Sequence, residues 1–396
     1  MRSDRQVSLR ILHAVEFYSP SVGGAQEVVK QISERLAARG HQVTVATSRI
    51  DARSSQSTGG VEIEQFDVQG NAVRGLEGEA KRYQRFVIDG DFDLVMTYAA
   101  QQWTTDALLP VIDQIKAPLV LAPCGFSALD NESYSAYFER LAFELPRFDA
   151  LILHSEGYQD ARFARAAGAS NMHLIPNGAD EREFGQLPAR GAFREAHGIG
   201  EDEPLVLTVG GHTGLKGHAQ AMAAFARATE CSGATLVTVA NQPTGRGCAF
   251  SCRQRSRWLN LTRRDRRVLL TDPPRAEVIA AYTDADAFLF CSMVECSPLV
   301  LFEAMAAGLP FLSLDVGNAA EIADWGGCGE IVPSGRNAAG NVTAPASAVA
   351  DRLNELLADP ERRSEMSVSG RSAWQERFTW ERIADQYEQL YESLLR

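Results

Sequence analysis

Residues 287–308 read AFLFCSMVECSPLVLFEAMAAG and contain the local pattern that decides the fold. The apolar start of this stretch, Ala287 to Cys291, is typical of a buried strand, and a helix is expected to begin after the loop. Ser297 suits the N-cap of that helix, and Pro298 suits its first position, where a missing N–H is harmless. A strand followed by a crossover helix predicts a parallel sheet.

The same alternation extends on both sides of this stretch. In the second half, strands are expected at Leu205–Val209, Ala234–Val239, Arg267–Leu270, Ala287–Cys291 and Pro310–Leu314. In the first half, they are expected at Leu9–Val15, Gln42–Thr47, Leu94–Thr97, Pro118–Ala122 and Leu151–His154. A helix over Ala25–Arg39 follows from apolar residues that recur at helical spacing, with Gly40 closing it. We therefore predict an α/β protein with two doubly wound, Rossmann-like domains that face one another across a cleft.

The chain has 396 residues, more than one hydrophobic core normally supports. The polar stretch 180–200 contains proline and glycine and is typical of a connector. We predict an N-terminal domain over residues 1–182, a C-terminal domain over 183–375 and a terminal helical segment over 376–396.

The composition is that of an ordinary globular protein, with 45% hydrophobic and 23% charged residues. The formal net charge of −12 argues against nucleic acid as a partner, because it repels a phosphate backbone. Seven scattered cysteines are typical of reduced thiols in a cytosol. The polar amino terminus predicts no signal peptide, and no apolar run reaches the ~20 residues of a membrane span. We expect a cytoplasmic protein.

The start of the helix after residue 297 is a candidate anion site. The amides of Leu299 and Val300 lie in the first helical turn, where free N–H groups attract phosphate. Glu295 precedes the helix and Glu303 lies about one turn into it, so a carboxylate is expected on each side of a bound diphosphate. Such acceptors suit the hydroxyls of a sugar or ribose. The alternative is that both glutamates are solvent-facing charges around a buried helix.

Two glycine-containing loops are further candidates. The loop GGHTGLKGH, residues 210–218, follows an expected strand; its glycines, including Gly211, allow close approach of a phosphate, and Lys216 supplies a cation. It is not a P-loop, because glycine follows the lysine. Gly23 and Gly24 lie in the corresponding loop of the other domain and are expected to face the same phosphates. Simple tight turns are the alternative for both loops.

These segments, in this order, resemble the retaining glycosyltransferases of the GT-B fold, group 1 or family 4. The resemblance runs almost end to end. It rests on Gly23-Gly24, RGHQVTV at 39–45, PNGAD at 176–180, Lys216-Gly217, and the Glu-x7-Glu signature from Glu295 to Glu303, which AMAAGLP follows at 304–310.

The resemblance implies a nucleotide-sugar donor held mainly by the C-terminal domain, with the acceptor on the N-terminal side. Glu303 would bind the ribose, Glu295 would lie near the transferred sugar and Lys216 would bind the diphosphate. Ser297 and the amides of Leu299 and Val300 complete the donor site, and the final helix packs back on the first domain. Lys216 and Glu295 are the expected catalytic residues. No cofactor is expected, because the nucleotide sugar is a substrate.

Two positions depart from the family pattern. Gly211 stands where members usually carry arginine, and Cys124 stands where many carry a histidine on the acceptor side. We still predict a retaining transferase that moves a sugar to a hydroxyl of a glycan, a lipid-linked or a small-molecule acceptor, by front-face attack. The alternatives are a phosphorylase or sugar-nucleotide hydrolase on the same scaffold, and a catalytically silent nucleotide-sugar-binding partner.

Three other patterns in the sequence concern metal binding or membrane contact. The triplets Asp91-Phe92-Asp93 and Asp284-Ala285-Asp286 precede apolar strands and are interpreted as strand-edge residues, so no metal is predicted. Cys248-x3-Cys252 lacks a second ligand pair in the sequence and is interpreted as incidental. The arginine-rich segment 246–267 is either a solvated face or a surface for peripheral contact with an anionic membrane, at the inner face of the membrane.

Overall fold

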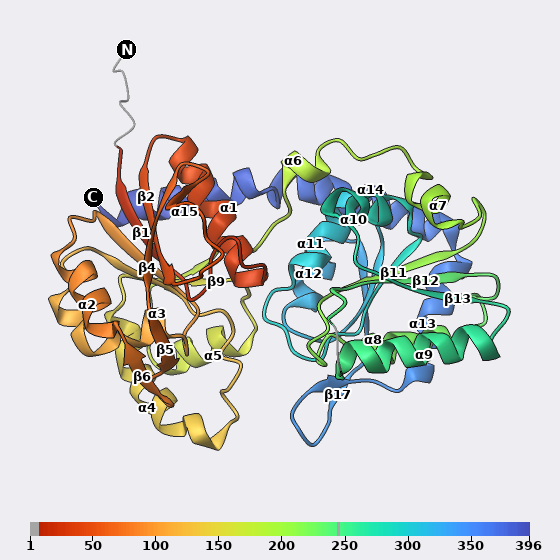
Figure 1. Cartoon of the computed structure of the whole chain (residues 1–396), viewed down its shortest axis with the longest axis horizontal. Helices are drawn as coiled ribbons and strands as arrows, with labels where there is room; N and C mark the ends of the chain where they lie inside the picture. Colours follow the sequence, from red (N-terminus) through yellow and green to blue (C-terminus); the bar gives the residue numbers. More distant parts are fainter. Residues whose placement is uncertain (1–7, 244–245) are drawn as a thin grey trace, which may run out of the picture. The chain divides into compact units, whose positions relative to one another are not determined.

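The computed structural model describes residues 8–243 and 246–396 (Figure 1). The chain divides into two compact units. Unit 1 runs to Asn177 and resumes at Trp380, whereas unit 2 comprises Gly178–Thr379. Each unit contains one main sheet with helices packed against it.

The chain passes from unit 1 to unit 2 after residue 177 and back after residue 379, whereas the predicted domain boundaries are residues 182 and 375. The shift has a local cause. The amide of Ala179 donates to the carbonyl of Phe378 at 3.0 Å, and the indole N–H of Trp374 donates to the carbonyl of Ala179 at 3.1 Å. These bonds tie both crossing segments to unit 2.

Unit 1 is built on an eight-stranded sheet in the order β10-β9-β8-β7-β1-β2-β4-β3. Its strands are β1 Arg10–Ala14, β2 Gln42–Ser48, β3 Ser57–Thr58, β4 Val61–Phe66, β7 Leu94–Tyr98, β8 Leu119–Ala122, β9 Ala150–Leu153 and β10 Met172–Leu174. All neighbours are parallel except β3, which runs antiparallel to β4. Strands β5 Val68–Asn71 and β6 Gly75–Gly78 form a separate hairpin.

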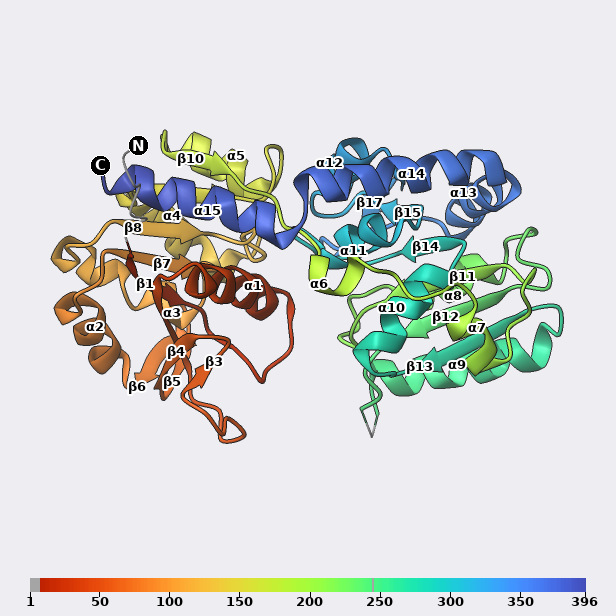
Figure 2. The same ribbon diagram turned by 90° about the horizontal axis from the view of Figure 1, so that it is seen from above.

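The helices of unit 1 include the last one in the chain. They are α1 Gly24–Ala38, α2 Ala80–Asp89, α3 Trp103–Asp106, α4 Ser135–Glu144, α5 Gln159–Ala166 and α15 Trp380–Leu394, with 3-10 turns at Leu109–Gln114, Glu132–Tyr134 and Leu145–Arg147. Helix α15 lies beside α1 in both views (Figures 1 and 2). Arg39 pairs with Glu388 at 2.6 Å, and Tyr391 contacts buried His13 at 3.0 Å. These contacts fix α15 on unit 1.

Unit 2 is built on a fully parallel six-stranded sheet in the order β13-β12-β11-β14-β15-β16. Its strands are β11 Leu205–Val209, β12 Thr235–Val239, β13 Arg267–Thr271, β14 Ala287–Phe290, β15 Phe311–Leu314 and β16 Gly329–Val332, with the hairpin β17 Gly335–Arg336 and β18 Val342–Thr343. The central strands β11, β12 and β14 are buried at every position except Val209 at the end of β11, as the continuous apolar runs predict.

Helices cover both faces of this sheet. They are α6 Glu181–Phe184, α7 Ala192–His197, α8 His218–Phe225, α9 Cys248–Thr262, α10 Arg275–Asp284, α11 Leu299–Ala307, α12 Ala319–Gly326, α13 Ala346–Ala358 and α14 Pro360–Arg377. Helices α8, α9 and α13 lie on one face, and α10, α11 and α14 on the other (Figure 1). Two doubly wound sheets confirm the predicted α/β class.

The strand order fixes where a ligand is expected. In unit 2 the chain winds outward from β11 through β12 to β13, then returns to β14 on the other side of β11, and β14 pairs with β11 at Val206–Ala287. In unit 1 the same reversal falls between β1 and β7. Open α/β sheets bind ligands beyond the carboxyl ends of the strands at such switch points.

Within the described residues, no helix combines the length and the apolar character that a membrane crossing needs.

Candidate functional site

The candidate site of unit 2 consists of the two loops that follow β11 and β14. The amide of Met293 donates to the carbonyl of Leu215 at 2.8 Å, which joins one loop to the other. Gly217 lies against the carbonyl of Cys291 with φ +69°, and a Cβ at this position would be only 1.7 Å from that oxygen. Only glycine allows the loops to approach this closely.

Lys216 and Glu295, the two predicted catalytic residues, form an ion pair in this site. Lys216 Nζ lies 2.6 Å from Glu295 Oε1, and the hydroxyl of Ser292 donates to the same oxygen at 2.6 Å. The Glu295 side chain is 12% exposed and that of Lys216 is 32% exposed. Lys216 is therefore held in place by a carboxylate, and part of its side chain remains exposed.

The helix start after β14 differs by one residue from the prediction. Pro298, not Ser297, is the N-cap of α11, because its ψ of 115° is extended and helical geometry begins at Leu299. The half-buried Ser297 lies just before the cap. Leu299 and Val300 are thus the first two helical residues, so their amides have no carbonyl partner within the helix. The helix start that the sequence predicts is therefore present in α11, one residue later than expected.

Glu303 is paired with an arginine that the sequence analysis missed. Arg275 Nη2 lies 2.6 Å from Glu303 Oε1 and 2.7 Å from Glu183 Oε2. Burial and then the charge of Glu303 raise the pKa of Tyr282, which packs in the same region. The alternative of a simple solvent-facing charge does not describe Glu303, since its side chain is only 15% exposed. Arg275 is the first residue of α10 and follows Pro273-Pro274. Its position in the sequence gives no sign that it contacts Glu303 of α11.

The remaining predicted donor residues lie at the edges of the site or in the other unit. Gly211 is followed by His212, whose amide donates to Asn241 Oδ1 at 2.9 Å, and a Cβ on Gly211 would meet only that oxygen at 3.4 Å. Gly23 is the N-cap of α1 and Gly24 its first residue, at the carboxyl end of β1. Gly23 and Gly24 belong to unit 1, whereas the other predicted donor residues belong to unit 2.

Unit 1 carries strained backbone at its own carboxyl edge. Ala99 and Gln101 follow β7 with φ of 69° and 66°, and Cys124 and Phe126 follow β8 with φ of 56° and 48°. Residues other than glycine adopt this left-handed region rarely, and such strain tends to collect at functional sites. The sequence singled out only Cys124 in this group.

A second cluster borders the Gly-rich loop. His212, His218, Cys248 and Cys252 each place one donor atom within 4.8 Å of the others. Cys248 and Cys252 show no second ligand pair in the sequence, which led to the interpretation that they are incidental. The structure supplies that pair, so this interpretation is wrong on its stated ground. The histidines precede the cysteines by 30 to 40 residues in the chain, which is why spacing did not reveal them.

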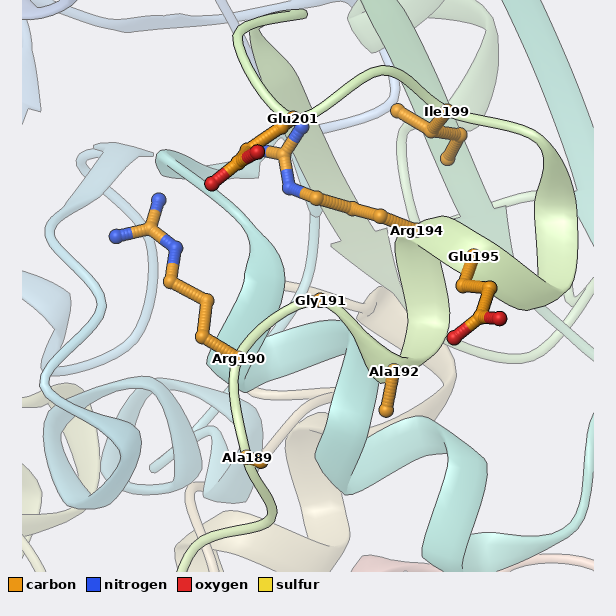
Figure 3. A pocket seen from close by; sticks show the side chains of 8 residues that line it. All are labelled: Ala189, Arg190, Gly191, Ala192, Arg194, Glu195, Ile199 and Glu201. Carbon is orange, nitrogen blue, oxygen red and sulfur yellow. The ribbon is translucent and has the colours of Figure 1, made fainter.

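A separate cavity of about 810 Å³ lies between Ala189 and Glu201 (Figure 3). Its Arg194 pairs with Asp286 at 2.9 Å, and Asp286 also accepts from the amide of Leu205 at 2.9 Å. Asp286 and Leu205 mark the amino ends of β14 and β11. The cavity therefore lies at the edge of the sheet opposite to the switch point.

Two family models match the chain in succession. The model described as "Glycosyl transferase 4-like domain" matches residues 23–178, and "Glycosyl transferases group 1" matches residues 189–373. The chain belongs to the group 1 glycosyltransferases. The second match contains both loops of the unit 2 site and the start of α11.

Individual relatives of this glycosyltransferase are distant but extend over its whole length. It is 24% identical to N-acetyl-alpha-D-glucosaminyl L-malate synthase of Bacillus anthracis over 384 residues, which is 95% of this chain and 96% of that protein. Sucrose-phosphate synthase of Thermosynechococcus elongatus has a TM-score of 0.78 at 22% identity, covering 98% and 99% of the two chains. Anabaena HepE, solved in complex with UDP, has a TM-score of 0.74 at 19% identity, covering 97% and 100%. The transferase thus has the expected GT-B architecture of two Rossmann-like domains.

Proposed function

We propose that this glycosyltransferase binds a nucleotide sugar at the switch point of unit 2 and transfers the sugar, with retention of configuration, to an acceptor hydroxyl. One observation carries the proposal: Lys216 and the amino end of α11 follow adjacent strands, β11 and β14, at the carboxyl edge of the sheet. A cation and a helix start together suit a diphosphate. The relatives include an N-acetyl-alpha-D-glucosaminyl L-malate synthase and a protein solved with UDP, which agree with such a donor.

The roles follow from the contacts. Lys216 and the amides of Leu299 and Val300 would stabilise the negative charge that builds on the diphosphate as its bond to the sugar breaks. Glu303, oriented by Arg275, would accept hydrogen bonds from the ribose. Glu295 holds Lys216 and presents its carboxylate on the side where the sugar would lie.

The transfer is proposed to be a front-face displacement. The acceptor oxygen forms a bond to the anomeric carbon while the bond to the diphosphate breaks, and the departing oxygen keeps the bonding electrons. The acceptor proton passes to the diphosphate. A covalent intermediate on Glu295 is disfavoured, because its Oε1 is already engaged by Lys216 and Ser292.

The reaction itself is proposed to need no metal ion. Asp91 and Asp93 both pair with Arg10. Asp284 accepts hydrogen bonds from the amides of Gly191 and Phe193. These carboxylates have structural partners, so neither Asp-x-Asp triplet is positioned as a ligand pair for a metal diphosphate. Full turnover in buffer without added divalent metal ions supports this proposal, and a requirement for added Mg²⁺ or Mn²⁺ contradicts it.

The acceptor is proposed to bind at the carboxyl edge of unit 1. The strained residues after β7 and β8 lie there, and Gln159 Nε2 donates to the carbonyls of Gly125 and Phe126 at 2.7 and 2.8 Å. These bonds hold the unusual backbone in place. We propose that this surface determines which acceptor is bound, whether a glycan, a lipid-linked molecule or a small molecule.

Donor binding is expected to depend on Glu303 but not on its neighbour Glu183. A panel of UDP-, GDP- and ADP-sugars should contain one base that raises the melting temperature, since a ligand at 100 times its Kd adds ~2.7 kcal/mol to stability. Glu303→Gln should remove most of that shift. Glu183→Gln also loses a bond to Arg275 but should keep the shift in melting temperature. An equal loss of this shift in both variants would contradict the role of Glu303.

Contact with an anionic membrane is a second proposal, carried by α9. Phe250, Trp258 and Leu261 are exposed by 44%, 60% and 72% and lie on one face of the helix, with Arg257 among them. Apolar side chains interleaved with arginine suit the interface of an anionic bilayer.

The expected result is binding to phosphatidylglycerol vesicles and none to phosphatidylcholine vesicles. Trp258→Ser combined with Arg257→Glu should weaken vesicle binding roughly tenfold or more. Val368→Ser is the control, because Val368 is an apolar residue that is 69% exposed but lies on α14, outside the proposed surface of α9. Unchanged sedimentation of the α9 variant with vesicles would count against the membrane surface.

A further inference from the structure

Four side chains of types that can bind a metal ion converge, from three segments, at the Gly-rich loop 210–218. His212 lies within the loop after β11, His218 is the first residue of α8, and Cys248 and Cys252 are one turn apart in α9. Helices α8 and α9 pack side by side on one face of the sheet (Figure 1). The cluster therefore links a loop and two helices.

Three of the six distances among the donor atoms are close to those of a tetrahedral site, and all four atoms lie within 4.8 Å of one another. The two Nδ1 atoms of His212 and His218 are 3.3 Å apart, Cys248 Sγ is 3.5 Å from His212 Nδ1, and the two sulfurs are 4.0 Å apart. A zinc ion with bonds of ~2.0–2.1 Å to nitrogen and ~2.3 Å to sulfur gives edges of roughly 3.3, 3.6 and 3.8 Å. The observed separations increase in the same order.

The ligand types narrow the choice of metal. Two thiolates and two imidazoles suit zinc, whereas magnesium and calcium prefer oxygen ligands. The cluster is half-buried at His212 and Cys248 and buried at His218 and Cys252, so an ion could enter from the loop side. By contrast, Cys231, Cys291 and Cys328 are at most 1% exposed within the apolar core of unit 2.

We propose that His212, His218, Cys248 and Cys252 bind one zinc ion that anchors the Gly-rich loop to α9. Four protein ligands complete the tetrahedron and leave no position for water or substrate, so the ion is structural. Lys216 lies between the two histidine ligands in the chain, and the ion thereby limits the motion of its loop. This site replaces the expectation that the chain holds no metal, and it does not depend on the proposed transfer reaction.

The competing explanation is a chain of weak hydrogen bonds among neutral thiols and imidazoles. Both explanations place the same atoms close together, but only the metal site takes up one equivalent of ion. The test uses the full chain, produced without a histidine tag and stripped with a chelator. It is titrated with Co²⁺ alone, and Zn²⁺ is then added.

The expected result is one equivalent of Co²⁺, with thiolate charge-transfer absorption and visible bands of tetrahedral cobalt that Zn²⁺ abolishes. The double variant Cys248→Ser with Cys252→Ser should lose these bands and at least about 100-fold in affinity. Ser251→Ala, an exposed residue of the same helix, is the matched control and should behave like the wild type.

Zinc should also raise the melting temperature of the stripped wild type but not that of the double variant. Octahedral cobalt spectra, or the absence of saturable uptake by the wild type, would overturn the proposal even if the double variant fails to fold. Equal spectra for the double variant and Ser251→Ala would overturn it as well.

Discussion

Replacing Lys216 with alanine is expected to lower kcat about 10²–10³-fold, with a much smaller change in KM for the donor. The ammonium group of Lys216 is held at the proposed diphosphate site by Glu295 at 2.6 Å. Because charge on the diphosphate increases as the glycosidic bond breaks, the cation stabilises the transition state more than the bound donor. Initial rates across donor concentrations separate the two effects.

Two further variants sharpen this prediction. Lys216→Arg keeps the positive charge and should retain more activity than Lys216→Ala. Lys81→Ala removes an exposed lysine of α2 in unit 1 and should be indistinguishable from the wild type. If folded Lys216→Ala kept its kcat, or lost activity only through KM, the assigned role would be wrong.

Gly217→Ala adds one methyl group to the proposed donor site. We expect it to destabilise the fold more than the same substitution at any other glycine of the Gly-rich loop. The backbone at Gly217 has φ +69°, and the new Cβ would overlap the carbonyl oxygen of Cys291 at 1.7 Å. Left-handed strain and overpacking together cost roughly 3 kcal/mol or more. For a unit of this size the melting temperature should fall by roughly 10 °C, and donor-induced stabilisation should disappear with the displaced loop.

Gly214→Ala isolates the contribution of the close approach. Gly214 lies in the same loop with φ +87°, but a Cβ there would meet nothing within 4 Å. Gly214→Ala introduces the left-handed backbone strain without a steric overlap. It should lower the free energy of unfolding by only about 1 kcal/mol. Thermal unfolding of the two variants, with and without donor, gives the comparison; equal losses would show that the contact with Cys291 is unimportant.

The strands that the sequence predicted are mostly rich in apolar residues, as in Leu94–Tyr98 and Ala287–Phe290. Leu205–Val209 was predicted without error, and the core strands of both sheets lie within two residues of their expected bounds. Strand β4 was missed because Val61–Phe66 alternates buried and more exposed residues, as a strand near the sheet edge does. Short runs such as β3 and β10 lack enough apolar residues to be recognised.

The residues of the candidate site were predictable where they belong to a single continuous strand-loop-helix segment. Lys216 and the α11 amides are of this kind, since a loop and the helix after it are continuous in sequence. Arg275 and the histidine ligands of Cys248 and Cys252 were not predictable, because strand order brings their partners together from distant segments. The N-cap of α11 was misplaced by one residue, because Ser and Pro are both favourable at a helix start.

The most direct test of the central claim is to incubate the purified enzyme with the nucleotide sugar that stabilises it and with candidate acceptors, and to analyse the products by NMR. The expected result is release of nucleoside diphosphate that depends on the acceptor hydroxyl, together with a glycoside of the same anomeric configuration as the donor, lost in Lys216→Ala. A sugar phosphate formed from added phosphate, or free sugar formed at the same rate without acceptor, would contradict the transferase assignment. An inverted product would contradict the front-face mechanism.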